Sequence, residues 1–413
     1  MNQQHYKKYF QRILIGCVLI PGLALTGCGQ FEADGEDDDD NEGSLRAIDF
    51  SQQVALIATA GDFGSQSGAH ALMSTVAPYN ALTNLAPTST TDLGVACYGQ
   101  AIFRLEKFGR NSITKFSLEA PTSHEWQYST TDADDEMEFS NSNPYDVISV
   151  SDTKAYVIRY GSPDVWIVDP SAGNGANFKT GMLDLRAYAD ADGKPEIASG
   201  VVVNGKLFLA MQRIDYTDNY LPGTAYVAVF DTVTDTEIDT GTGSVFKGVQ
   251  LPAKNPLKME YLAANDTIYL QAVGKYEGFV LPAYYDGGIV TLNPNDYQTS
   301  LLVDDGDADT HIYGNIINMA LVSPQKGYFV GYAEWADTSL YSFNPTTGSV
   351  DGQPVAQLEH LDISDINVDN TGRLWVGRRG DAGITLVDSN TDQILEPLIA
   401  TDLNPIQIVF CGG

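Results

Sequence analysis

Three acidic loops of this sequence carry the side chains best suited to holding a metal cation. The middle loop reads Asp190-Ala-Asp192-Gly-Lys-Pro-Glu196, and similar acidic runs occur at 132–135 and 304–311. Asp residues at alternate positions beside a Gly begin many calcium-binding loops, because Ca²⁺ prefers oxygen ligands, and none of the three runs completes an EF-hand loop. Asp190, Asp192 and Glu196 are the best candidates for a Ca²⁺ site, since their carboxylates can converge.

A second set of side chains has the chemistry to bind an anion. Basic residues stand at the ends of predicted strands, at corresponding points of a repeat, with a Tyr in one repeat: Lys107, Arg159, Arg213, Lys275, Arg378 and Tyr332. Placed around one mouth of a folded domain, they would direct an attractive field at an anionic ligand. The alternative is that each base neutralises Asp or Glu side chains of the neighbouring loops, and the sequence leaves both interpretations open.

Several loops near these basic residues are rich in aromatic side chains. They contain Tyr216 and Tyr220, then Tyr276, Tyr284 and Tyr285, and finally Trp335. Exposed aromatic rings supply contact area at a small entropic cost and are enriched at binding surfaces. We predict that they form a ligand-binding surface together with the basic residues; the alternative is that they fold down over their own strands.

The composition excludes several functions. The chain has 23 Lys+Arg against 54 Asp+Glu and a formal net charge of −31. Binding a phosphate backbone needs a basic surface, so nucleic acid is not an expected partner. The His residues lack the paired spacing of zinc or haem sites, and the sequence holds neither a Gly-x-Ser-x-Gly elbow nor a phosphate-binding Gly loop. No catalytic residues are therefore predicted.

The elements that must position these side chains are short β-strands. Residues 143–185 contain four β-rich runs separated by Gly, Ser, Pro and Asp, which is typical of one four-stranded antiparallel sheet. The same pattern recurs about every 45–60 residues, a spacing that indicates a propeller or a solenoid. Six complete units can be counted, with first strands near Gly94, Tyr145, Ala198, Met259, Ile316 and Ile363.

The two ends of the repeat array are incomplete. Residues 54–85 supply about three strands and 405–411 supply one, so joining them makes a seventh unit. Closing the ring in this way removes the exposed strand edges of an open array. We therefore predict an all-β, seven-bladed β-propeller closed by a composite blade from both termini.

The turns after the third strands resemble those of a known family. They begin with Asp or Asn followed by Pro, Ser or Thr, at Asp169, Asp231, Asn293, Asn344 and Asp388. Together with an aromatic residue on each second strand (Phe103, Tyr156, Phe208, Tyr269, Phe329 and Trp375), they resemble the YVTN/YncE-like β-propellers over residues 50–411. The resemblance implies the fold and says little about function.

The N-terminus indicates export to the cell envelope. Residues 1–27 have a basic start and a short apolar run, which is typical of a signal peptide. The following Leu25-Thr-Gly-Cys28 resembles a bacterial lipobox, which implies that Cys28 is acylated, for example with palmitate, and that Gly29 favours the outer membrane. Residues 28–49 are predicted to be an acidic tether and 50–413 the propeller, on the periplasmic or the cell-surface side.

Two cysteines remain once Cys17 leaves with the signal peptide and Cys28 is acylated. Cys97 is predicted on the innermost strand of the first complete blade, and Cys411 on that of the composite blade beside it. An oxidising compartment and two Cys on neighbouring strands predict a disulfide. The alternative is a pair of reduced, buried thiols.

These features favour a monomeric binding module. By analogy with other lipid-anchored propellers, one mouth would capture a small anionic ligand or dock an envelope partner such as an outer-membrane transporter. The first alternative is a structural or assembly propeller that contacts envelope proteins. A lactonase-like hydrolase that uses a cation bound near Asp190 is the less favoured alternative.

Overall fold

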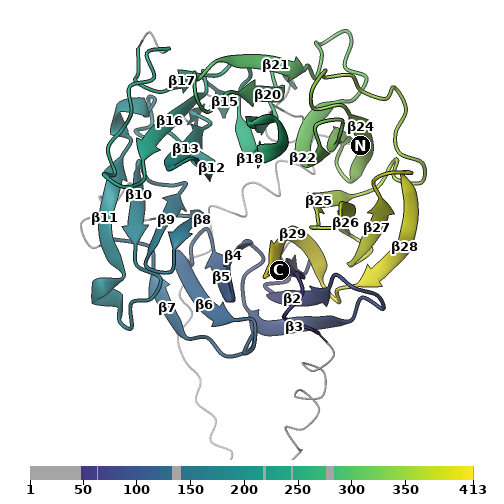
Figure 1. Cartoon of the computed structure of the whole chain (residues 1–413), viewed down its shortest axis with the longest axis horizontal. Helices are drawn as coiled ribbons and strands as arrows, with labels where there is room; N and C mark the ends of the chain where they lie inside the picture. Colours follow the sequence, from purple (N-terminus) through teal and green to yellow (C-terminus); the bar gives the residue numbers. More distant parts are fainter. Residues whose placement is uncertain are drawn as a thin grey trace, which may run out of the picture. The chain divides into compact units, whose positions relative to one another are not determined.

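The computed structural model describes residues 48–62, 64–132, 141–216, 220–242, 245–275 and 283–412. They belong to one compact unit, Gly43–Gly413, whose main sheets surround a common axis as seven blades (Figure 1). This confirms the predicted seven-bladed β-propeller. The predicted signal peptide, the acidic tether and Cys28 lie outside the described residues.

Each blade is an antiparallel sheet whose first strand is innermost. Blades 1 and 2 consist of β4 (Leu93–Tyr98), β5 (Ala101–Glu106), β6 (Ser112–Ser117) and β7 (Trp126–Ser129), then β8 (Pro144–Ser151), β9 (Lys154–Arg159), β10 (Asp164–Val168) and β11 (Lys179–Asp184). Blade 3 has β12 (Ile197–Val203), β13 (Lys206–Met211), β16 (Tyr226–Asp231) and β17 (Val249–Gln250), with a small hairpin of β14 (Ile214–Asp215) and β15 (Leu221–Pro222) between its second and third strands.

The remaining blades follow the same order. Blade 4 has β18 (Pro256–Leu262), β19 (Thr267–Ala272), β20 (Gly288–Leu292) and β21 (Thr299–Val303); blade 5 has β22 (Asn315–Ser323), β23 (Lys326–Glu334) and β24 (Asp337–Phe343). Blade 6 has β25 (Ile363–Val368), β26 (Arg373–Arg378), β27 (Gly383–Asp388) and β28 (Gln393–Ala400). The described helices are three short 3₁₀ turns, η2 (Gly175–Asn177), η3 (Arg186–Tyr188) and η4 (Ala263–Asn265).

Blade 7 is the predicted composite of both ends of the described chain. The C-terminal β29 (Asn404–Cys411) is its inner strand and pairs with β1 (Val54–Ala60), from Val54 opposite Cys411 to Ala60 opposite Asn404. The blade is completed by β2 (Gly68–Ser74) and β3 (Ala81–Thr88). Pairing the two ends closes the ring, so the array leaves no open strand edge between its first and last blades.

Blade 5 departs from the prediction of six complete units. Its sheet has three strands, and the segment that follows contacts the third strand through two isolated bridges, Phe343 to Val350 and Thr338 to Leu361, and through single backbone hydrogen bonds such as that from Val355 N–H to Leu340 O. Pro354 lies between these bridges and has no backbone N–H for a ladder. The expected fourth strand is therefore replaced by an irregular segment.

A separate hydrophobic cluster fills each of the seven spaces between neighbouring blades. Each blade is thus buried on both faces, which explains why β1 reads as a continuous apolar run and is buried at every position. A buried sheet with two covered faces needs no alternation of polar and apolar residues. This division into seven small cores explains how a chain segment as long as the described residues 48–412 folds as one unit.

The polar turns after the third strands link neighbouring blades. The first residues of a second strand reach the turn of the next blade: Lys154 Nζ lies 2.7 Å and Tyr156 Oη 2.5 Å from Asp235 carboxylate oxygens. Lys326 and Tyr328 bind Asp392 in the same way, so Tyr328 is the counterpart of Tyr156 and the predicted Phe329 is its neighbour. The recurring first Asp of such a turn bonds within the turn itself, as Asp231 does with the N–H groups of Val233 and Thr234.

A second polar series follows a repeated irregularity of the inner strands. In six of the seven blades, one residue near the start of the inner strand is left out of the pairing with the neighbouring strand. The residue after it is polar in each case: Asp146, Ser199, Lys258, Asn318, Asp365 and Gln407. We call these six residues the polar belt.

Hydrogen bonds made by polar-belt residues link neighbouring blades. Lys258 Nζ donates to the Asn318 side-chain oxygen at 3.1 Å, and Asn318 Nδ2 donates to Asp365 at 2.6 Å. Asp365 also accepts from the backbone N–H of Ile408 in blade 7, and Gln407 accepts from that of Val95 in blade 1. The belt therefore connects the inner strands of blades 4, 5, 6, 7 and 1.

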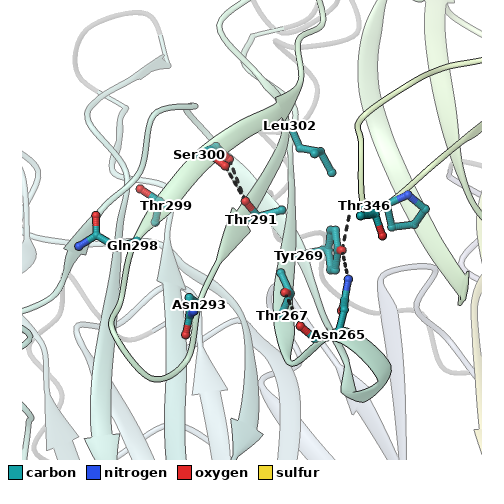
Figure 2. A pocket seen from close by; sticks show the side chains of 11 residues that line it. Asn265, Thr267, Tyr269, Thr291, Asn293, Gln298, Thr299, Ser300, Leu302 and Thr346 are labelled. Atoms are coloured by element: carbon teal, nitrogen blue, oxygen red, sulfur yellow. Dashed lines mark hydrogen bonds between the residues drawn. The ribbon is translucent and has the colours of Figure 1, made fainter. Parts of the chain in front are cut away.

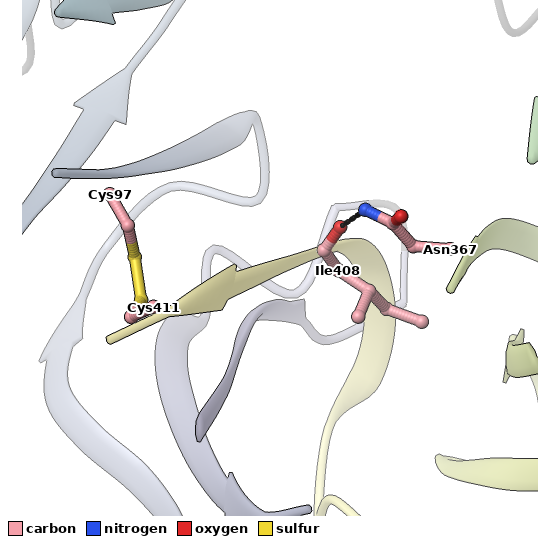
Figure 3. Close-up of a disulfide and its surroundings, with 4 residues drawn as sticks. All are labelled: Cys97, Asn367, Ile408 and Cys411. Carbon is pink, nitrogen blue, oxygen red and sulfur yellow. Dashed lines mark hydrogen bonds between the residues drawn. A yellow bond between two sulfur atoms is a disulfide. The ribbon is translucent and has the colours of Figure 1, made fainter. Parts of the chain in front are cut away.

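Cys97 and Cys411 form the predicted disulfide, with their Cα atoms 5.4 Å apart (Figure 3). The bond joins the inner strands of blades 1 and 7. The alternative of two reduced thiols does not describe this structure.

The buried His70 predicts that acid lowers the stability of the fold. Burial, and then the nearby charge of Arg104, lower the pKa of His70 in β2 to about 3. The unfolded chain therefore binds one more proton than the folded chain between about pH 6.5 and 3, and stability falls as pH falls through this window. From pH 7 to 4.5 this residue alone should remove about 2–3 kcal/mol of unfolding free energy.

Urea unfolding at these two pH values measures the effect. His70→Gln should show a smaller difference between pH 7 and 4.5 than the wild-type chain. The matched control is His124→Gln, because His124 is exposed. An equal pH difference in wild type and His70→Gln would contradict the prediction.

Candidate functional site

The candidate residues lie mostly on one face of the propeller. We call this the upper face, defined as the loops that join second to third strands and those that join one blade to the next. The opposite, lower face carries the turns between first and second and between third and fourth strands. All described residues that were predicted to bind a ligand or a metal are at or next to upper-face loops.

The three predicted metal ligands converge just before β12. Asp190, Asp192 and Glu196 each place one carboxylate oxygen so that the three oxygens lie within 4.8 Å of one another. The second oxygens hold the loop: Asp190 accepts from the N–H of Asp192, and Asp192 accepts from that of Lys194. Glu196 is fully buried.

The electrostatics of this cluster are those of crowded acids. Burial, and then the charges of Asp192 and Asp190, raise the pKa of Glu196 to about 9. Burial likewise raises the pKa of Asp192 to about 6. The donors are all carboxylates, so the cluster fits a hard cation that prefers oxygen ligands better than it fits zinc.

The cluster is bonded to the loop that carries β14 and β15. The second oxygen of Glu196 accepts from the N–H of Ile214 at 3.0 Å. The hydroxyl of Tyr216 lies 3.1 Å from that of Tyr160, which donates to Gln212 at 2.7 Å. Burial raises the pKa of Tyr216 to about 12, with Glu196 and Asp192 adding to the effect. Tyr216 is therefore both part of this polar cluster and an upper-face side chain.

Three of the five basic residues that were predicted to bind a ligand instead contact other groups of the protein. Arg159 is fully buried, donates to Thr130 O and Ser162 Oγ, and lies over the Trp166 ring. Lys275 is buried, with its ammonium 5.0 Å from the centre of the Tyr284 ring.

Arg213 donates to the carbonyl oxygens of Tyr188 and Thr224, and it lies over two aromatic rings. The expectation of a collar open to an anion is therefore not met at Arg159 and Lys275. The Arg159 guanidinium contacts a carbonyl oxygen, a hydroxyl and an aromatic ring of the protein itself, and the Lys275 ammonium lies over the Tyr284 ring.

The other two bases fit the alternative of local neutralisation. Arg378 forms an ion pair with Asp381 at 2.6 Å. The Lys107 ammonium lies 4.4 Å from the centre of the Tyr145 ring, and burial lowers its pKa although Asp92 and Asp146 act in the opposite direction. Blade 1 contributes no residue to the polar belt, and its inner strand carries Gly94. A Cβ placed on Gly94 would lie 3.1 Å from the Lys107 Cε, so the lysine side chain fills the space beside this glycine. Tyr332 lies in β23 and is half-buried.

The predicted aromatic surface is partly present. Trp335 at the β23–β24 turn, Tyr216 and Tyr284 are 70%, 42% and 41% exposed. Tyr220 packs edge-on against Tyr216, and Tyr285 stacks on His311 with ring centres 4.1 Å apart. Tyr276 lies outside the described residues.

Sequence reasoning missed three further exposed apolar side chains on the same face, Phe108, Leu221 and Ile312, which are 63%, 38% and 68% exposed. It also missed a groove of about 520 Å³ between blades 4 and 5, lined mainly by uncharged polar groups, with Leu302 and Pro345 among them (Figure 2). There the Tyr269 hydroxyl donates to Pro345 O and accepts from Asn265, and Thr291 bonds Ser300. Single Thr, Ser and Asn residues on strand ends give no sequence signal for such a groove.

Comparison with known proteins supports the fold. No family model and no curated protein matches the chain. Among solved structures, hydrazine synthase of Kuenenia stuttgartiensis is similar with a TM-score of 0.52 and 11% identity, over 74% of this chain and 84% of that one. Apo AztD from Citrobacter koseri has a TM-score of 0.48 and 12% identity, over 87% and 97% of the two chains.

BamB from Moraxella catarrhalis has a TM-score of 0.45 and 13% identity, over 78% of this chain and 81% of that one. At these identities the similarity concerns the propeller fold alone. The YVTN/YncE-like resemblance therefore stays a prediction. Within the described part of the chain, no helix has the length and apolar character needed to cross a membrane.

Proposed function

We propose that this chain is a binding propeller of the bacterial envelope that docks a protein partner on its upper face. A lipid anchor at Cys28 would hold it at the outer membrane, as the lipobox-like sequence predicts. The Cys97–Cys411 disulfide supports an oxidising, extracytoplasmic compartment. The partner would be an envelope protein, such as a transporter or an assembly component.

The distribution of exposed aromatic side chains carries this proposal. Of the five exposed aromatic residues among the described ones, four lie on upper-face loops: Phe108, Tyr216, Tyr284 and Trp335. The fifth, Tyr98, lies on the lower face. Aromatic residues are enriched in the buried centres of protein interfaces, where they supply most of the binding energy.

The charges of the upper face favour a protein partner over a small anion. The predicted basic ligands contact other groups of the protein, whereas Asp304, Asp307 and Asp309 of the neighbouring acidic loop are exposed. An apolar surface with an acidic surround is complementary to a partner with apolar pockets and a basic rim. Capture of a small anionic ligand is therefore the less favoured form of the proposal.

Photocrosslinking tests which face binds the partner. A photoreactive amino acid would replace Trp335 or Phe108 in the full-length chain in cells of its own species, and Val233, which is exposed on the lower face, would provide the matched control. We expect one envelope protein to crosslink from Trp335 and Phe108, with at least tenfold less product from Val233.

The partner should also bind the purified chain, with a Kd at least tenfold weaker for Trp335→Ser than for Val233→Ser. Replacing an aromatic residue at the centre of an interface costs about 1–4 kcal/mol, whereas replacing a residue outside it costs little. Equal crosslinking from both faces, or equal affinity of the two variants, would refute the upper-face proposal.

A further inference from the structure

We propose that Asp190, Asp192 and Glu196 form a calcium-binding site that fastens an upper-face loop to blade 3. The loop, residues 212–224, includes β14 and β15 and carries Tyr216 and Leu221. The site is independent of the docking proposal, because ion binding requires no partner. Only its consequence for docking rests on the proposed function.

Three unpartnered oxygens are the main observation. Asp190 Oδ2, Asp192 Oδ2 and Glu196 Oε1 are buried from solvent, and none of them accepts a hydrogen bond. The first two belong to half-buried residues of a turn, but Glu196 is a fully buried side chain, and one of its carboxylate oxygens lies within 4.8 Å of a carboxylate oxygen of each Asp. Buried carboxylate oxygens without partners are costly, and a cation between them supplies the missing interaction.

The donor set identifies the class of ion. The three ligand atoms are carboxylate oxygens, without His or Cys, which favours Ca²⁺ over zinc or copper. Calcium binds oxygens at about 2.3–2.6 Å, so two of its ligands can be up to about 5 Å apart. The three oxygens lie within 4.8 Å of one another, inside this limit. Water and backbone carbonyls commonly complete the six to eight ligands of such a site.

The position of Glu196 connects the ion to the loop. One carboxylate oxygen is free for the ion, and the other accepts from Ile214 N–H. The backbone carbonyls of Glu196 and Pro195 accept from the N–H groups of Gln212 and Arg213. Fixing Glu196 therefore fixes the first residues of the loop. Lys194 of the same loop is the other source of positive charge for these three carboxylates. If the Lys194 ammonium alone neutralised them, the chain would bind no calcium.

Calorimetric titration of the full-length chain with CaCl₂, after treatment with EDTA, tests the site directly. We expect one saturable ion per chain and a Kd at least tenfold weaker for Glu196→Gln, which keeps the shape and removes one charge. The matched control is Asp307→Asn, because Asp307 lies in an exposed acidic loop and bonds only its own turn. Terbium luminescence, sensitised by the nearby tyrosines, should show the same order of affinity, with Glu196→Gln weaker than the wild type and Asp307→Asn.

Thermal unfolding distinguishes a variant that has lost one ligand of the ion from a variant that no longer folds. In EDTA, Glu196→Gln should be at least as stable as the wild-type chain, because the amide keeps the shape of the buried side chain and cannot carry a charge that burial would penalise. At a calcium concentration near the wild-type Kd, calcium should raise the Tm of the wild-type chain and of Asp307→Asn clearly more than that of Glu196→Gln. If Glu196→Gln does not fold, Asp192→Asn gives the same comparison, since Asp192 is only half-buried.

Two results would overturn the proposal. One is a wild-type chain that binds no calcium at millimolar concentration; the other is a Glu196→Gln variant that binds it as tightly as the wild type. A site that prefers Mg²⁺ over Ca²⁺ would also overturn the choice of ion. The docking proposal can fail separately: calcium would then still bind and stabilise the chain, while no partner crosslinks from Trp335.

Discussion

Replacing both Cys97 and Cys411 with Ala should lower the free energy of unfolding by about 5 kcal/mol, because the disulfide closes a very long loop. The two residues are 314 positions apart. Such a crosslink removes conformations from the unfolded chain and adds little to the folded one. Urea unfolding of the purified chain measures the loss as a lower midpoint.

The folded ring should survive this change, since β29 still pairs with β1 along its whole length. Figure 3 also shows a second link from the inner strand of blade 7, a hydrogen bond from Asn367 of blade 6 to the Ile408 carbonyl at 2.9 Å. The double variant should therefore show native circular dichroism at 25 °C and unfold at lower urea.

Two controls test the cause of this effect. Reduction of the wild-type chain should lower its midpoint to that of the double variant, and reduction should leave the double variant unchanged. A double variant within about 1 kcal/mol of the oxidised wild type would mean that the unfolded chain gains little freedom when the bond is lost. The entropic argument would then be wrong for this ring.

The sequence predicts the fold well because each blade is buried between two others. Strands covered on both faces become apolar runs such as Val54–Ala60, and the turns between them are marked by Asp, Asn, Gly and Pro. The count of strands left at the two ends then predicts the composite blade, and the composite blade places Cys97 beside Cys411. Each of these steps depends on local patterns that recur.

The candidate site was harder to predict because its side chains choose partners from other blades and loops. The position of Arg159 at the end of a strand was correct, but its burial depends on Trp166 and on Thr130 of a loop before the blade. The polar belt shows the same limit. Asp365 reads as an ordinary polar residue of a strand, and its bond to Ile408 appears only once β25 and β29 lie side by side.

The Ca²⁺ candidates were predicted because their signal is local. Asp190, Asp192 and Glu196 lie within one short loop, so their spacing alone restricts how far apart the carboxylates can be. The structure adds what spacing cannot provide, the burial of Glu196 and its bond to Ile214. Tertiary packing therefore distinguishes this loop from residues 304–309, where Asp304, Asp307 and Asp309 are exposed.

Asp369→Ala should lower the free energy of unfolding by about 3–5 kcal/mol, because it breaks a buried ion pair by removing one partner. The Asp369 side chain is fully buried in the turn between β25 and β26. It accepts from Arg373 Nε at 2.8 Å, Trp375 Nε1 at 2.9 Å and Thr371 Oγ1 at 2.6 Å. Removing it leaves the Nε–H of Arg373 and the indole N–H of Trp375 without their acceptor. Urea unfolding of the purified variant measures the loss.

The matched control is Asp388→Ala in the same blade. Asp388 also accepts from its own turn, from the N–H of Asn390 at 2.9 Å, but its carboxylate is accessible to water. Water can therefore replace the lost bonds, and the urea midpoint of this variant should stay close to that of the wild type. Equal losses in the two variants would show that turn geometry, not the buried charge, is what matters.

The reason for the large effect lies beyond the turn itself. Arg373, held by Asp369, donates to the Tyr79 hydroxyl at 3.2 Å and to the Thr75 carbonyl, both in the β2–β3 turn of blade 7. Asp369 thus supports the contact of blade 7 with blade 6, while the disulfide supports its contact with blade 1. In Asp369→Ala/Arg373→Met no unpaired charge remains, so the double variant should be more stable than Asp369→Ala alone. A double variant that is less stable would mean that the arginine contributes mainly through its contacts with blade 7.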